Sequence, residues 1–266
     1  MRNQKRVWSF FLKGKGESMK KIITILALLV GVLFFNHNCL ASDPAQGTSI
    51  AVSASEKSSE VLPIPDPLQG INRAFYKFND KLYFWVLKPV AQGYGKVLPR
   101  PARLSVQNFF ENIYAPVRMV NCGLQCEFNE ASIELSRFGL NTTVGLVGFF
   151  DPAKNWFHLT PPDVEDFGQT LGCHLGPGFY LNIPFAGSSS LRDLIGSVVD
   201  SCIVPSYYVL THYPAAYYAA GAELLMEINR TSLRIGEYEE FKRAALDPYV
   251  AIRDAYNQHR EALIKK

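Results

Sequence analysis

Apolar side chains recur at helical spacing along most of this chain, and this periodicity limits the possible folds more than any other feature. Ile71, Phe75, Phe78 and Leu82 are spaced four, three and four residues apart, which places them on one face of an α-helix. Helical spacing recurs later in the chain, in residues 106–125, 131–150, 191–199 and 215–265. We therefore predict a mainly α-helical protein with a single folded domain.

Prolines and glycines mark where these helices end. Proline removes a backbone donor and clashes with the preceding helical turn, so Lys88-Pro89 predicts an interruption of the first helix and Pro116 a kink or a break. Residues 161–192 are rich in glycine, which favours an irregular segment with a short strand or extended stretch at 179–183. Further breaks are predicted at Asp151-Pro152, Gly236 and Asp247-Pro248.

The N-terminal part of the chain has the features of an export signal. Lys20-Lys21 precedes a continuous apolar run over residues 22–35, which is shorter than the roughly 20 residues that span a bilayer. We therefore predict that residues 1–41 are a signal peptide. Met19 is a second possible start, so residues 1–18 either are not translated or enlarge the basic region, and the sequence leaves both alternatives open.

Cys39 raises the question of a lipid anchor. A lipoprotein signal has an apolar residue three positions before the cysteine and a small residue directly before it, whereas residues 36–38 here are Asn, His and Asn. Ordinary cleavage between Ala41 and Ser42 fits the pattern better, so we expect an unlipidated N-terminus. Residues 42–65 have no apolar period and are rich in Ser, Ala, Pro and Glu, which predicts a disordered linker.

The composition indicates a surface that partly faces lipid or a partner protein. Charged residues make up 19% of the chain and hydrophobic residues 48%, whereas a soluble domain usually has about a quarter charged residues. The net charge of +3 gives no electrostatic argument for binding nucleic acid.

Four cysteines remain after the predicted cleavage, and two interpretations of them stay open. Cys122 and Cys126 are four residues apart, a spacing that would put both on one face of a helix. Export permits disulfides, in which case we expect one of this pair to bond Cys173 and the other Cys202. The alternative is that the four are buried free thiols that pack as small apolar residues.

The sequence gives no pattern for catalysis or for a metal. Cys122, Cys126 and Cys173-His174 lack the CxxC-like pairs of structural zinc sites, and the histidines are scattered. Ser188-Ser189-Ser190 lies outside any GxSxG frame and is better explained as a polar turn that caps the helix at Leu191. We interpret Asp163, Glu165 and Asp166 as a solvated acidic loop. We expect no enzyme activity, no metal and no cofactor.

The end of the predicted central helix has an unusual composition. Residues 144–150 are apolar on nearly every side, so this helix end is expected to be buried in protein or in lipid. Gly145 and Gly148 would let another backbone come close there.

Motifs along the whole domain carry a family resemblance. A set of motifs covers residues 66 to about 260, namely Asp66-Pro67-Leu68, Asn72-Arg73, Phe78-Asn79, Lys88-Pro89-Val90, Pro99-Arg100-Pro101-Ala102-Arg103, Asn108-Phe109, Arg137-Phe138, Asn141-Thr142, Asp151-Pro152-Ala153, Phe167-Gly168-Gln169-Thr170-Leu171-Gly172, Leu191-Arg192-Asp193, Asp247-Pro248-Tyr249 and Arg253-Asp254. In these motifs the chain resembles the MlaA/VacJ family. Any one of these motifs would be weak, and together they are specific.

The resemblance implies a function in the cell envelope. It implies that residues 66–266 form a ring-like helical domain embedded in the inner leaflet of the outer membrane, on its periplasmic face. An amphipathic channel through the ring would take phospholipid from the outer leaflet to a soluble periplasmic lipid carrier and so maintain lipid asymmetry. A trimeric outer-membrane porin would be the scaffold. The alternative function is a porin-associated structural protein that moves no lipid.

Eight residues are candidates for lining the lipid passage: Phe78, Asn79, Asp80, Arg137, Asn141, Val144, Gly145 and Gly148. Asn79 and Asp80 lie either at a channel mouth or on a helix surface. Arg137 either meets a lipid phosphate or pairs with a carboxylate inside the fold such as Asp193, and we favour the ion pair. Rings at the headgroup level are expected from Tyr83, Trp85 and Trp156.

Overall fold

The computed structural model describes residues 64–204 and 215–265, so the predicted signal peptide, its cleavage site, Cys39 and nearly all of the predicted linker lie outside the described residues. The elements in chain order are α2 (Gln69–Leu82), η2 (Tyr83–Leu87), α3 (Lys88–Val97), α4 (Arg100–Leu124), α5 (Phe128–Thr143), α6 (Pro152–Asn155), α7 (Phe167–Gly172), β1 (Tyr180–Ile183), β2 (Gly187–Ser190), α8 (Leu191–Ile203), α10 (Ala215–Leu233), α11 (Glu237–Ala244) and α12 (Pro248–Ile264).

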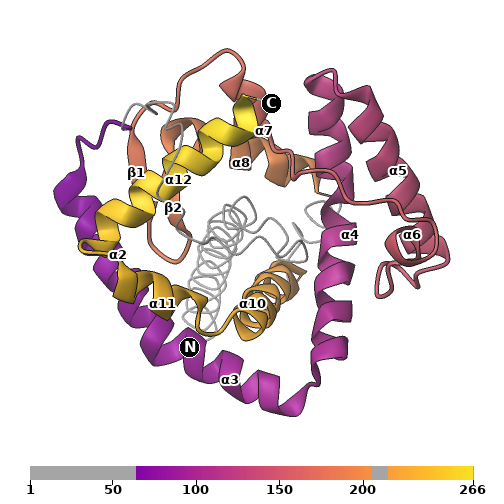
Figure 1. Ribbon diagram of the computed structural model, residues 1–266, viewed down its shortest axis with the longest axis horizontal. Coiled ribbons are helices and arrows are strands. Elements are labelled where there is room, and N and C mark those ends of the chain that lie inside the picture. Colours follow the sequence, from indigo (N-terminus) through magenta and orange to yellow (C-terminus); the bar gives the residue numbers. More distant parts are fainter. Residues whose placement is uncertain (1–63, 205–214, 266) are drawn as a thin grey trace, which may run out of the picture.

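The helices are arranged as a closed loop (Figure 1). Helices α2 and α3 form one side, α4 forms the next, and α7, α8 and α12 complete the circuit back to α2. The α5–α6 segment packs on the outer side of α4, whereas α10 contacts α3 and α4 from inside the loop. The predicted mainly helical, ring-like fold is confirmed. Within the described ranges, no helix has the length and apolarity needed to cross a membrane.

The only two strands in the described part of the chain form an antiparallel hairpin. The pairing begins at Tyr180 with Ser190 and ends at Ile183 with Gly187, which confirms the short strand expected near 179–183. Ser190 is also the N-cap of α8, because its side chain accepts a hydrogen bond from the Asp193 backbone N–H. The predicted capping role is therefore confirmed, although Ser188–Ser190 is a strand and not a turn.

The sequence predicted an interruption of the first helix at Lys88-Pro89, and this prediction was wrong. The chain passes from α2 to α3 through the π-helical turn η2, in which the Lys88 N–H donates to the Tyr83 carbonyl. A π turn absorbs one extra residue without breaking the helix, so Pro89 sits at the start of α3 where its missing N–H is tolerated. Pro116 likewise lies inside α4, which continues past it.

The interior is unusually polar. Among the described residues, more polar and charged side chains than hydrophobic ones are buried, and many large hydrophobic side chains are exposed. Asn72 illustrates the packing, since its side chain donates to Asp66 and to the Tyr180 carbonyl and accepts from the Asn182 N–H. Buried polar groups of this kind are stable only when hydrogen-bonded, and here they join α2 to the hairpin.

Candidate functional site

The predicted helical end over residues 144–150 is instead a tight loop, which we call the apolar loop. Helix α5 ends at Thr143, and Leu146, Val147 and Gly148 then take positive φ values of 52°, 60° and 95°. The loop is closed by its own backbone, because the Gly148 N–H donates to the Asn141 carbonyl and the Phe150 N–H to the Gly145 carbonyl. A left-handed backbone cannot continue a right-handed helix, so the prediction of a helix to residue 150 was wrong.

The apolar loop presents its side chains to the surroundings. Leu146 is 62% exposed and Phe150 is 57% exposed, and Val144, Val147 and Phe149 are also exposed. A half-exposed side chain of this size forgoes about 1 kcal/mol or more of apolar burial in water. Contiguous exposed apolar groups of this kind mark binding or membrane contact sites.

A polar clasp, made of Arg137, Asn141 and Asp151, holds the two ends of the apolar loop together. Arg137 on α5 pairs with Asp151 Oδ2 at 2.9 Å and also donates to the Leu159 carbonyl. Asn141, one turn further along α5, donates to Asp151 Oδ1 at 3.0 Å and accepts from the Ala153 N–H. The predicted ion pair of Arg137 with an internal carboxylate is therefore present, but its partner is Asp151 and not Asp193.

Helix α4 fixes the position of the apolar loop. The ring of Phe149 stacks on Phe109 with centroids 4.7 Å apart. A Cβ atom on Gly148 would lie 2.4 Å from Asn112 Cβ, and a Cβ atom on Gly145 would lie 2.5 Å from the Asn141 carbonyl oxygen. The two glycines therefore permit close packing, as predicted, but the neighbours are the Asn112 side chain and the loop's own backbone.

The predicted residues of α2 form a second group. Asn79 donates to Asn182 and to the Ile183 carbonyl and accepts from the Phe185 N–H, so it anchors α2 to the β1–β2 hairpin. Phe78 and Phe185 are both exposed and pack edge to face at 5.2 Å. Helix α2 and the α5–α6 segment lie on opposite sides of the loop of helices (Figure 1), so the eight candidates do not form one cluster.

Asp80 belongs to the contact between α2 and α11. Its carboxylate pairs with Lys242 at 2.7 Å and accepts a hydrogen bond from Tyr238 at 2.9 Å. The Lys242 ammonium also lies 4.8 Å from the centroid of the Phe84 ring. These contacts give Asp80 a structural role between two helices.

The acidic segment expected to be solvated is largely buried. Asp166 caps α7 and pairs with Arg260 of α12 at 2.6 Å, while Arg260 also pairs with Asp193 of α8. Tyr256 donates to Asp193, and burial raises the pKa of its hydroxyl well above the usual value. Sequence reasoning missed this ionic cluster because its members are distant in the chain. The available signal was that Asp166 precedes the Phe167-Gly168 motif and that Asp193 lies within Leu191-Arg192-Asp193.

Cys122, Cys126, Cys173 and Cys202 are free thiols in the structure, which matches the second of the two alternatives that the sequence left open. Cys122 is buried, whereas Cys126, Cys173 and Cys202 are exposed. Cys126 lies beyond the end of α4 with a φ of 62°, so it does not share a helix face with Cys122 as expected. Burial, and then the charges of nearby glutamates, raises the pKa of Cys122 to about 12.

Comparisons with known proteins agree with this architecture. A family model described as MlaA lipoprotein matches residues 64–263. The chain belongs to the MlaA family. An MlaA relative from Escherichia coli K12, named as the intermembrane phospholipid transport system lipoprotein, is 33% identical over 223 residues, which cover 82% of this chain and 85% of the relative. The protein of that name from Haemophilus influenzae is 30% identical, over 73% of this chain and 77% of the relative.

A solved structure also resembles this MlaA-family chain. It concerns the maintenance of bacterial outer membrane lipid asymmetry, and it matches with a TM-score of 0.66 and 32% sequence identity over 75% of this chain and 98% of that chain. The family resemblance is thus confirmed in both sequence and fold. The names of these relatives describe lipid transport and no chemical reaction.

Proposed function

We propose that this protein is an outer-membrane component of intermembrane phospholipid transport, the function named for its MlaA relatives. It would remove phospholipid from the outer leaflet and maintain lipid asymmetry. The observation that carries this proposal is the inverted surface of the fold, which buries polar side chains and exposes large apolar ones such as those of the apolar loop. Such a surface suits a domain that lies among lipid tails.

The proposed location follows from the same surface. The domain would sit at the periplasmic face of the outer membrane, with the apolar loop in the hydrocarbon region and Trp85 and Trp156 near the headgroups. A trimeric porin would hold it there, and a soluble periplasmic carrier would accept the lipid. Transfer of this kind needs no covalent step, because a carrier that binds the lipid more tightly draws it along.

Given their positions in the structure, the eight candidate residues would have different roles in lipid transport. Phe78 and Val144 offer exposed apolar surface to a lipid chain. Arg137 and Asn141 would act indirectly by holding the apolar loop, and Gly145 and Gly148 by letting it close. Asn79 and Asp80 would set the position of α2 against its neighbours.

The test replaces an exposed side chain of the apolar loop. A Gly145→Trp variant would not decide the matter, since a Cβ atom there already collides with backbone oxygens. Leu146 is suitable because it is exposed and has a left-handed backbone that Asp tolerates. We predict that Leu146→Asp fails to clear phospholipid from the surface of a deletion strain, whereas Leu146→Met clears it as the wild type does.

Outer-leaflet phospholipid would be measured on intact cells, together with the amount of each variant in the outer-membrane fraction. The proposal is supported if phospholipid accumulates on the surface of the deletion strain and both wild type and Leu146→Met clear it. Leu146→Asp, present in equal amount, should not clear it. If the deletion strain accumulates no surface phospholipid, or if Leu146→Asp clears it fully, the role assigned to the protein or to the loop is wrong. Porin retention without any lipid phenotype would identify the structural alternative.

A further inference from the structure

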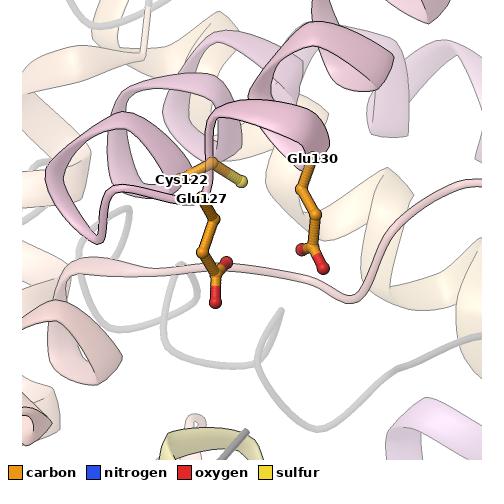
Figure 2. A group of neighbouring side chains, drawn as sticks. All are labelled: Cys122, Glu127 and Glu130. Atoms are coloured by element: carbon orange, nitrogen blue, oxygen red, sulfur yellow. The ribbon is translucent and has the colours of Figure 1, made fainter.

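Three potential metal ligands meet where α4 turns into α5. Cys122 lies in the last turn of α4, Glu127 is the N-cap of α5 and Glu130 lies in the first turn of α5. The Cys122 sulfur and one carboxylate oxygen from each glutamate lie within 4.8 Å of one another. Figure 2 shows the two glutamates projecting on the same side of this turn, beside the cysteine. The three donors are held by one short, well-defined turn.

Two of these donors are buried. Cys122 has no exposed surface and is a free thiol, bonded to no other described cysteine. Glu127 Oε2 is also buried, with no hydrogen-bond partner among the described residues. A buried thiol packs as a small apolar group without such a partner, whereas an unsatisfied buried carboxylate oxygen costs about 1–3 kcal/mol or more. A ligand that satisfied Glu127 Oε2 would therefore be stabilising.

The local charge is negative. Glu127, Glu130, Glu134 and Glu165 all act electrostatically on Cys122. Arg118 pairs with Glu134 at 2.9 Å, and Glu165 accepts a hydrogen bond from the neutral Gln125. The negative end of the α4 dipole and the positive end of the α5 dipole meet at this turn and oppose each other, so the carboxylates set the local charge. A cation at this position would therefore be attracted by carboxylates on both sides of the turn.

We propose that Cys122, Glu127 and Glu130 form a binding site for a divalent transition-metal ion of the Zn²⁺ class. Zn²⁺ accepts sulfur and carboxylate ligands at about 2.0–2.3 Å, so ligand atoms in a tetrahedral site are about 3.5 Å apart. Small rotations of two glutamate side chains would bring the present arrangement to that spacing. Water would take the fourth position. This donor set differs from the Cys122, Cys126, Cys173 and His174 set that the sequence disfavoured.

The consequence would be a fastened turn between α4 and α5. Helix α5 carries Arg137 and Asn141 of the polar clasp, so a metal at its N-terminus would stabilise the helix that positions the apolar loop. Binding to the folded state alone raises the melting temperature. The site is independent of the proposed lipid transport, and its test does not use transport as a readout.

The full chain would be purified in detergent with a non-thiol reductant, stripped with a chelator and titrated with Zn²⁺ and with Co²⁺. Bound metal is counted by elemental analysis, and Co²⁺ reports a thiolate ligand through a charge-transfer band in the near ultraviolet. We expect one ion per chain, a cobalt–thiolate band and a higher melting temperature with Zn²⁺. Binding of less than one ion per chain, or a cobalt complex without the thiolate band, would overturn the proposal.

Three variants locate the site. Cys122→Ser should remove the cobalt–thiolate band, and Glu127→Gln should weaken Zn²⁺ binding at least about tenfold. Cys126→Ser is the matched control, because Cys126 is an exposed thiol in the same turn, and it should bind as the wild type does. If Cys122→Ser fails to fold, Glu127→Gln decides. Wild-type affinity in Glu127→Gln, or loss of the band in Cys126→Ser, would exclude this donor set.

Discussion

Gly148 stands where the apolar loop packs against α4, and its backbone φ of 95° lies in the left-handed region. An added Cβ atom would be 2.4 Å from Asn112 Cβ and 2.9 Å from Asn112 Cγ. Asn112 is itself held, since its amide donates to the Thr142 hydroxyl at 2.9 Å. Both the backbone conformation and the close neighbour therefore require glycine at this position.

We predict that Gly148→Ala lowers the free energy of unfolding by about 2–4 kcal/mol, because left-handed strain and a steric clash add. Gly139→Ala is the control. Gly139 lies inside α5, and a Cβ atom added to it would meet no neighbouring element within 4 Å, so alanine should raise stability by up to about 1 kcal/mol. Urea unfolding in detergent measures both. Equal stability of the two variants would mean that Asn112 moves aside at little cost.

At the scale of elements, Asp200 joins three helices. It lies on α8, accepts a hydrogen bond from Asn121 of α4 at 2.8 Å, and accepts another from the Phe167 N–H at the start of α7 at 3.0 Å. Burial, and then the charge of Asp166, raises the pKa of Asp200 from 3.8 to about 7, and the two hydrogen bonds and Arg260 oppose this shift. The junction of α4, α7 and α8 therefore contains a carboxyl group that titrates near neutral pH.

A raised pKa in the folded state makes stability fall as pH rises. Between pH 4 and pH 7 the folded protein holds a proton on Asp200 that the unfolded chain has released, so the free energy of unfolding decreases across this window, by on the order of a few kcal/mol. Asp200→Asn stays neutral and should flatten this decrease. It loses one acceptor, which costs about 1 kcal/mol at low pH.

Chemical unfolding of both proteins at pH 5, 6, 7 and 8 measures this difference. The stability of Asp200→Asn relative to wild type should improve from pH 5 to pH 7 and level off towards pH 8. Parallel curves for the two proteins would show that Asp200 is ionised throughout this range and that other groups set the pH dependence.

Sequence patterns predicted the elements well where local spacing decides the structure. The amphipathic stripe from Ile71 to Leu82 is a helix, and Gly236 and Asp247-Pro248 separate α10, α11 and α12 as expected. The prediction of a helix over residues 144–150 was wrong because apolar character is equally compatible with a helix end and with an exposed loop. Only the contacts with Asp151 and Asn112 distinguish the two, and no local pattern contains them.

The buried polar contacts were beyond sequence reasoning for a similar reason. Arg260 lies far along the chain from Asp166 and Asp193, and their pairing depends on how α12 returns to α7 and α8. Aspartate and glutamate are mostly exposed in folded proteins, which favours the solvated interpretation. The family motifs contained Asp193 but gave no indication of its partner.

At the scale of the whole molecule, aromatic residues are exposed on different parts of the loop of helices. Trp85 in η2 is 75% exposed and Trp156 beside α6 is 67% exposed, while Tyr83 donates a hydrogen bond to Glu239 and faces α11. Indole rings favour the boundary between lipid tails and headgroups. The two tryptophans are therefore suitable reporters of how the domain lies on a bilayer.

We predict that both tryptophans enter the interface when the protein binds phospholipid vesicles. Trp8→Phe is combined with Trp85→Phe or with Trp156→Phe, so that each variant keeps one of the two reporters. In each variant the fluorescence of the remaining tryptophan should shift to shorter wavelength and be quenched by lipids brominated near the headgroup. Phe75→Tyr, on another exposed site, serves as the control for a surface change. Unshifted emission from both tryptophans in vesicle-bound protein would place these faces away from lipid.

The π turn between α2 and α3 has a consequence for the evolution of this domain. An α-helix advances by about 100° per residue, so the additional residue in η2 rotates everything after it by about that angle relative to an uninterrupted helix. Ala91 is fully buried on α3, which packs against α10. Deleting one residue from 83–87 would preserve nearly the whole composition and still turn Ala91 out of its buried position. The number of residues in η2, more than their identity, sets which faces of α2 and α3 point towards the elements that they pack against.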